Sequence, residues 1–116
     1  MLPIRAALIG ATTAVALFVA GFPASPSAGE AAVRIDNFNF TPPTLIVTPG
    51  TMVIWTNADD SPHSVREKDG KFKSAALDTD DTFSQTFAAP GEYEYFCSIH
   101  PYMTGKIVVK PAGPSS

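Results

Sequence analysis

Turn-forming residues divide the chain into short segments beyond residue 31, and this division restricts the folds open to it. Turns are expected at Pro42-Pro43, at Pro49-Gly50 and at Ala89-Pro90-Gly91. With 11 prolines and 8 glycines in 116 residues, the chain has little room for long helices outside its first segment. The segments between the turns are rich in Val, Ile, Thr and aromatic residues, which favour strands.

Apolar and polar residues alternate in the first of these segments, where Val33 and Ile35 fall on the face opposite to Arg34 and Asp36. Such a period of two indicates a half-buried strand. The expected strands cover residues 33–40, 45–47, 51–57, 63–66, 82–87, 93–97 and 105–110, and residues 67–74 are expected as a surface loop. Short strands separated by turns predict an all-β sandwich of seven to eight strands.

The first 31 residues follow the order of a secretory signal peptide. A short segment with one positive charge (residues 1–5) precedes an uncharged apolar run (residues 6–22) and a stretch of small residues, proline and glycine. An uncleaved membrane anchor is the alternative. The apolar run is short for a bilayer span, however, and no basic residues follow it.

We therefore expect residues 1–29 to be a signal peptide, with the cleavage point between residues 27 and 31. The mature domain is expected at residues 32–110, followed by a flexible tail at residues 111–116. This organisation predicts a soluble, monomeric periplasmic protein that does not associate with the membrane after cleavage. The net charge of −3 argues against a nucleic acid partner, because such partners bind to a basic surface.

The chain contains one cysteine, Cys97, which excludes an intramolecular disulfide and any zinc site built on two or more cysteines. Cys97, His100 and Met103 form a Cys-x₂-His-x₂-Met run between the last two expected strands. The other histidine, His63, lies far upstream, directly after a proline-containing loop. A thiolate, two imidazoles and a weak thioether are the ligand set of an electron-transfer copper site.

Each of these four residues, taken singly, also has an ordinary structural interpretation. A lone cysteine is usually a small buried apolar residue, and a lone methionine fills space in a core. The combination favours a metal site, because both histidines and the only cysteine take part and the spacing is tight. An exported chain with one unliganded thiol would also risk oxidation or intermolecular pairing.

Residues 33–110 resemble the cupredoxins, the small blue copper proteins, and are most like the amicyanin group. The motifs that carry the resemblance are Asn37-Phe38-Asn39-Phe40-Thr41-Pro42, Pro49-Gly50-Thr51 with Trp55-Thr56-Asn57, Asp60-Ser61-Pro62-His63, Phe72-Lys73-Ser74, and the stretch from Pro90 through Cys97 to Gly105. The two-residue gap between His100 and Met103 matches amicyanins, whereas plastocyanins and pseudoazurins have a longer gap.

The resemblance implies a Greek-key sandwich with one copper ion, held equatorially by His63, Cys97 and His100 and axially by Met103. It also implies a one-electron carrier rather than an enzyme. Its redox partners would be a donor like methylamine dehydrogenase and a c-type cytochrome acceptor. One position departs from the family pattern: cupredoxins often have Asn after the first ligand histidine, and this chain has Ser64. The shorter serine puts the bracing of the ligand loop in doubt.

We expect the ring edge of His100 to face solvent through an apolar patch of Ile99, Pro101 and Tyr102, where a redox partner would dock. Three other functions compete with electron transfer. A nucleophilic Cys–His enzyme lacks a framing motif around Cys97, and a zinc site would gain little from a thioether. Copper handling without a dedicated redox partner is the remaining alternative, although the chain has no Met- or His-rich tract.

Overall fold

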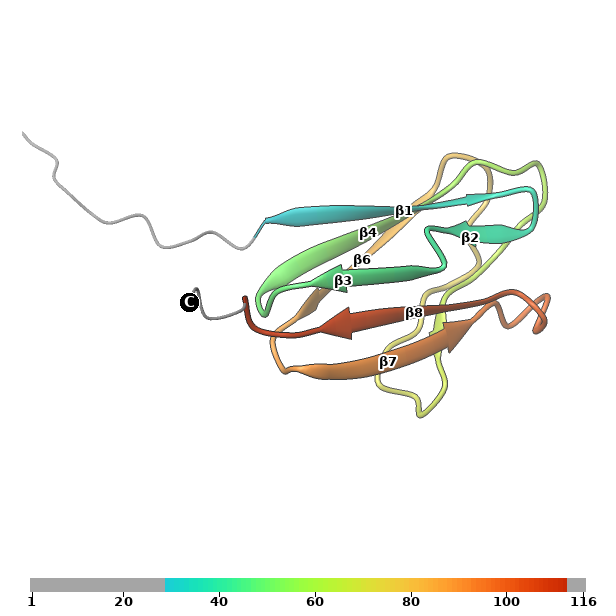
Figure 1. The fold of residues 1–116 in the computed structure, drawn as a ribbon. Helices are drawn as coiled ribbons and strands as arrows, with labels where there is room; N and C mark the ends of the chain where they lie inside the picture. The colour runs from blue at the N-terminus through green and yellow to red at the C-terminus, as the bar shows by residue number, and fades with distance from the viewer. Residues whose placement is uncertain (1–28, 113–116) are drawn as a thin grey trace, which may run out of the picture.

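The computed structural model describes residues 29–112, and this part of the chain folds into eight strands (Figure 1). The strands are β1 (Glu30–Asp36), β2 (Asn39–Thr41), β3 (Thr44–Val47), β4 (Thr51–Asn57), β5 (Arg66–Glu67), β6 (Thr82–Phe87), β7 (Gly91–Phe96) and β8 (Thr104–Val109). No helix in residues 29–112 is long and apolar enough to cross a membrane. The predicted signal peptide and the end of the predicted tail lie outside the described residues.

Two four-stranded sheets face each other across the core. One has the strand order β2-β1-β4-β6, and the other has the order β3-β8-β7-β5. Both are mixed, because β1 runs parallel to β4 and β3 runs parallel to β8, whereas the remaining neighbours are antiparallel. The predicted all-β sandwich is therefore confirmed, with eight strands.

Strand β4 matches the strand expected at residues 51–57. It lies between β1 and β6, so both of its edges are hydrogen-bonded. Its residues alternate between buried and half-buried, with Val53 and Trp55 turned into the core. The β-branched and aromatic residues of this segment pack well on a pleated surface, which explains why it forms a strand.

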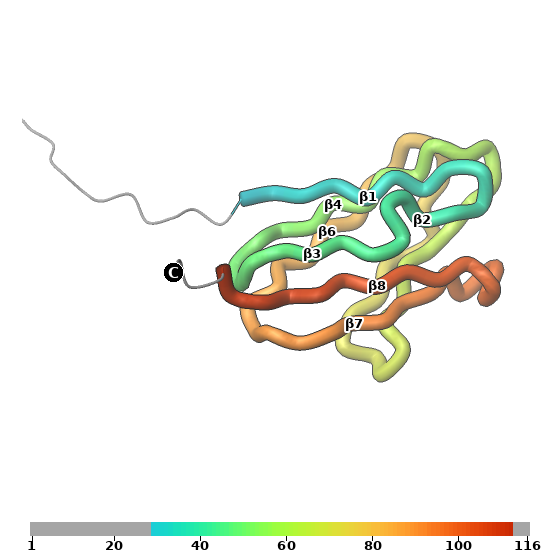
Figure 2. The backbone as a smooth tube through the Cα atoms, in the orientation of Figure 1, coloured from blue at the N-terminus to red at the C-terminus, as the bar shows by residue number. Residues whose placement is uncertain are grey.

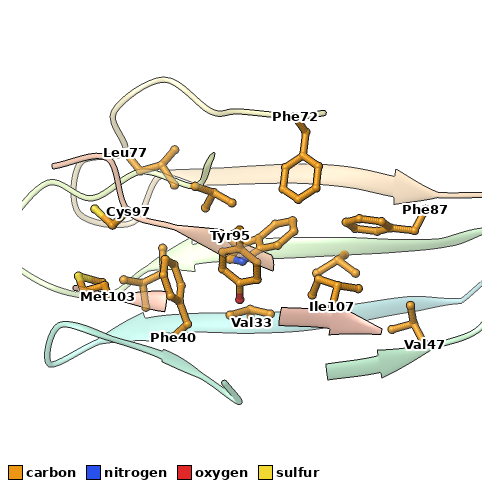
Figure 3. Packing of buried hydrophobic residues seen from close by; sticks show 14 of the residues in the cluster. Val33, Phe40, Val47, Phe72, Leu77, Phe87, Tyr95, Cys97, Met103 and Ile107 are labelled. Carbon is orange, nitrogen blue, oxygen red and sulfur yellow. The ribbon is translucent and has the colours of Figure 1, made fainter. Parts of the chain in front are cut away.

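The core is aromatic in its middle and carries sulfur at one end (Figure 3). Tyr95 is buried there, with its ring edge-to-face against Phe40 and Trp55 at centroid distances of 4.7 and 5.4 Å. Burial raises the pKa of Tyr95 to about 12, although the nearby Trp55 indole opposes the shift. Cys97 and Met103 lie together at the end of this cluster (Figure 3).

The first expected strand is wrong at Phe38. Residues 33–40 do not form one strand, because Asn37 and Phe38 make a two-residue turn that joins β1 to β2. Both have positive φ, at 56° and 59°, the combination that a tight hairpin of this type requires. The turn leaves the Phe38 side chain partly exposed instead of alternating into the sheet.

Two further boundaries differ from expectation. The expected strand at residues 63–66 is reduced to β5, and Glu67, expected in a surface loop, is buried. Its Oε1 accepts the N–H groups of Asp69 and Lys71, so the carboxylate organises the following turn from inside. Strand β1 begins at Glu30, two residues before the expected start of the domain.

The loops of interest and the ends of the described chain lie at opposite ends of the sandwich (Figures 1 and 2). The turn between β1 and β2 and the loop between β7 and β8 share one end. Strand β1 begins and strand β8 finishes at the other. The four predicted ligands lie at the end that holds the β1–β2 turn and the β7–β8 loop.

Candidate metal centre

The loop between β7 and β8 holds three of the four predicted ligands, and two backbone hydrogen bonds close it. The N–H of Cys97 donates to the carbonyl of Met103 at 3.0 Å, and the N–H of Met103 donates to the carbonyl of His100 at 2.9 Å. Because β7 and β8 pair up to Phe96 and Thr104, the loop begins and ends on adjacent residues of one ladder. Its conformation is thus fixed by the sheet.

His63 comes from a different part of the chain and is fully buried. Its N–H donates to the carbonyl of Leu77 at 3.0 Å, and the N–H of Leu77 donates back to its carbonyl at 2.7 Å. Asn57, also buried, donates from Nδ2 to the carbonyls of Ser61 and Leu77. These bonds hold the segment that leads into His63 against the end of β4.

The structure brings His63, Cys97 and His100 together. Their candidate ligand atoms all lie within 4.8 Å of one another. The Cys97 Sγ is 3.9 Å from Nδ1 of His63 and 3.9 Å from Nδ1 of His100. Two bonds of about 2.0 to 2.3 Å that meet at one ion span a gap of about 4 Å. The distances from the Cys97 sulfur to both imidazoles therefore match a mononuclear site.

The predicted fourth ligand, Met103, is buried at the same end of the core as Cys97. Together the four residues offer one thiolate, two imidazole nitrogens and one thioether. This donor set fits copper, because thiolate and thioether are soft ligands and imidazole serves both of its oxidation states. It fits zinc less well, because structural and catalytic zinc sites do not rely on a thioether.

An aromatic ring covers the two histidines. The ring of Phe38 stands edge-to-face to His63 and to His100, with a centroid distance of 5.1 Å in both cases. The Tyr102 ring lies 6.1 Å from the His100 ring. His100 is half-buried, while Ile99, Pro101 and Tyr102 are exposed around it.

A carboxylate from the loop before His63 also belongs to the site. Oδ2 of Asp59 lies 2.8 Å from Nε2 of His63, on the side of the ring away from Cys97. Burial by itself would raise the pKa of Asp59, but hydrogen bonds from the backbone N–H groups of the β1–β2 turn and from His63 outweigh it. The pKa of Asp59 therefore lies below its ordinary value.

Ser64 connects the two segments that carry the predicted ligands. Its N–H points at the Cys97 sulfur at 3.3 Å, and its hydroxyl oxygen accepts the N–H of Ser98 at 2.8 Å. The Ser64 and Ser98 hydroxyls are also 2.7 Å apart. The bracing contact put in doubt by the shorter side chain is present, because the loop at Ser98 lies within reach of a serine.

Replacing Ser64 with alanine is expected to lower the free energy of unfolding of the metal-free protein by about 1 to 2 kcal/mol. The change removes the buried Ser64 hydroxyl that accepts the N–H of Ser98, and a hydrogen bond of this kind contributes about 1 kcal/mol. Urea unfolding measures the loss. The matched control is Ser84→Ala on the exposed face of β6, expected to change stability by less than about 0.5 kcal/mol. Equal losses in both variants would show that Ser64 does not brace the loop.

Asp59 and Phe38 are the two site residues that sequence reasoning missed. Phe38 looked like a strand residue, since its positive φ leaves no mark in local propensity. A signal for Asp59 was present in its position four residues before His63, near a proline-containing turn. That spacing gains meaning only once the path of the loop is known.

Comparisons with known proteins support the family assignment. The family model described as a Cupredoxin-like domain matches residues 9–109. Amicyanin-alpha from Methylorubrum extorquens is 38% identical over 88 residues, which cover 72% of this chain and 74% of the relative. Amicyanin from Paracoccus denitrificans is 36% identical over 87 residues, covering 71% of this chain and 66% of the relative.

Solved structures agree. A purple cupredoxin from Nitrosopumilus maritimus superposes with a TM-score of 0.65 at 34% identity, covering 69% of this chain and 99% of that one. An amicyanin variant solved in its Cu(I) form gives a TM-score of 0.66 at 30% identity, covering 76% and 86%. The chain belongs to the cupredoxin family, and among cupredoxins it is most similar to the amicyanins.

Proposed function

We propose that the protein is a one-electron carrier with a single type 1 copper ion held by His63, Cys97, His100 and Met103. The observation that carries the proposal is the 3.9 Å spacing of the Cys97 sulfur from both imidazole Nδ1 atoms. The similarity to amicyanins, one of them solved in its Cu(I) form, supports copper as the ion. Copper supplies the one-electron chemistry of the Cu(I)/Cu(II) couple.

The protein's contribution is a stiff, dry set of donors. Cys97 and His63 are fully buried and Met103 is nearly so, which keeps water away from three of the four ligating groups. Backbone hydrogen bonds fix the ligand loop and the His63 segment. Donors held in this way change little between the two oxidation states, so an electron can enter or leave with little rearrangement.

The half-buried His100 ring offers the shortest route between the site and the surface. Phe38 joins Ile99, Pro101 and Tyr102 there in an exposed apolar patch, which we call the His100 patch. A small apolar patch suits encounters that form and dissociate quickly. The partners that dock on it are a donor like methylamine dehydrogenase and a c-type cytochrome acceptor, by similarity to amicyanins.

The protein functions in the periplasm after loss of residues 1–29. The support is the signal-peptide pattern of its first residues. A cut no later than Gly29 would leave β1 complete, since Glu30 and Ala31 already pair with Met52 and Val53 of β4. The domain then comprises β1 to β8.

Copper titration tests the function directly. The purified protein is expected to bind one equivalent of Cu(II) and to develop an intense visible thiolate-to-copper band that disappears reversibly on one-electron reduction. Copper handling would instead give rapid transfer of Cu(I) to a competing chelator, and the burial of the donors argues against it. A protein that stays colourless after copper addition and oxidation would contradict the proposal.

A further inference from the structure

The carboxylate of Asp59 binds three donors from two parts of the chain. Oδ1 accepts the N–H of Asn37 at 2.7 Å, and Oδ2 accepts the N–H of Phe38 at 2.9 Å. Oδ2 also lies 2.8 Å from Nε2 of His63. The same carboxylate thus contacts a predicted ligand and the turn whose phenylalanine ring covers that ligand.

The backbone of Asp59 is anchored independently of these contacts. Its N–H donates to Oδ1 of Asn57 at 2.9 Å, and its carbonyl accepts the hydroxyl of Thr79 at 2.6 Å. Asn57 is in turn fixed by its own bonds to Ser61 and Leu77. The carboxylate is therefore held in place before it engages His63, and changing its chemistry need not unfold the loop.

An ionised carboxylate can only accept a hydrogen bond, so its contact at 2.8 Å requires a proton on Nε2 of His63. In a neutral imidazole, a proton on Nε2 leaves Nδ1 as the free lone pair. Nδ1 is the atom that faces the Cys97 sulfur at 3.9 Å. The contact thus selects the one tautomer of His63 in which the Nδ1 lone pair is free to bind a metal ion.

We propose that Asp59 is a positioning residue that holds His63 with Nδ1 free for the metal and fixes the Phe38 turn over the same ring. This inference rests on the proposed function, since it concerns how the copper ligands are prepared. Carboxylate partners of metal-bound histidines fix ring orientation and raise ligand basicity. The side chain of Asp59 is 12% exposed and that of His63 is fully buried, so solvent screens the pair little.

The first test needs no metal and no variant. In the metal-free protein, long-range ¹⁵N–¹H correlation spectra at neutral pH report which nitrogen of each histidine carries the proton. His63 is expected to be protonated at Nε2 and unprotonated at Nδ1. A His63 protonated only at Nδ1 would overturn the inference, whatever the copper chemistry turns out to be.

The second test compares Asp59→Asn with Asp60→Asn. Both remove one negative charge, and Asp60 is an exposed neighbour. An amide has a single acceptor oxygen, so its NH₂ group must face at least one of the three donors. Asp59→Asn is expected to lower Cu(II) affinity 10- to 100-fold, and Asp60→Asn by less than about threefold. The Asn variant should also show both His63 tautomers in the metal-free spectra.

The reduction potential provides a third readout. A carboxylate next to a ligand stabilises Cu(II) more than Cu(I), so its removal raises the potential. A tenfold loss of affinity confined to Cu(II) corresponds to a rise of about 59 mV for a one-electron couple. If Asp59→Asn and Asp60→Asn had the same affinity and potential, Asp59 would have no positioning role. A wild type that never develops the visible band would instead reject the electron-carrier function and leave the tautomer result standing.

Discussion

A Cys97→Ser variant is expected to lose the intense visible band completely and to bind Cu(II) at least 100-fold more weakly than the wild type. The band arises from charge transfer between thiolate sulfur and copper, and a hydroxyl oxygen cannot replace it. Serine is also a poor ligand at neutral pH, because its hydroxyl stays protonated. The site keeps two imidazoles and a thioether, so weak binding without colour is the expected outcome.

Optical titration with Cu(II) and competition with a chelator of known affinity measure the two effects. The fold should survive, because serine nearly matches cysteine in volume and the Ser64 N–H, 3.3 Å from the sulfur, remains a donor to the new hydroxyl. Met103→Leu is the matched control within the same loop. It removes only a weak axial ligand, so its band should persist while its potential changes. A Cys97→Ser protein that stayed blue would exclude the assigned thiolate.

Replacing Gly105 with alanine is expected to lower the free energy of unfolding by about 3 kcal/mol. Gly105 lies opposite Tyr95 in the β7–β8 ladder. A Cβ atom built on Gly105 would overlap Cζ and Oη of the Tyr95 ring. That ring is buried against Phe40 and Trp55, so it cannot shift without disturbing this packing. Chemical denaturation of the metal-free protein measures the loss.

A double-mutant cycle separates this overlap from general damage to β8. In a Tyr95→Leu background the overlapping atoms are gone, so the added methyl should cost less than about 1 kcal/mol. The cycle then gives a coupling of about 2 kcal/mol between the two positions. If Gly105→Ala cost the same in both backgrounds, the Tyr95 ring would not be the reason for glycine at this position.

The parts of the fold that sequence reasoning predicted well are those where pattern and environment agree. Strands β4 and β6 fall at the residues expected, because both segments are rich in residues with high β-propensity. The hairpin at Phe38 was missed because a strand-forming residue takes a positive φ there. Glu67 was misjudged for a related reason: its burial depends on the path of a loop rather than on its own polarity.

The same distinction applies to the candidate site: its ligands could be predicted from the sequence, and a supporting contact could not. The clustering of His63, Cys97 and His100 could be predicted from residue types. The chain has one thiol and two imidazoles, and together they match the ligand set of a copper site. The contact between Asp59 and His63 could not be predicted, since it depends on how the turn after β4 is folded. The types of the metal ligands can be identified from the sequence, whereas the hydrogen bonds that support them depend on the conformation of the loops.

The opposite placement of the His100 patch and the ends of the described chain has a practical consequence (Figures 1 and 2). A cysteine-free linker or affinity tag added after Lys110 would attach the molecule at the end of the sandwich opposite the His100 patch. On a chip or electrode, the protein would then stand with Tyr102 and His100 facing the solution. The architecture thus lends itself to oriented immobilisation, with the patch left open to a partner in solution.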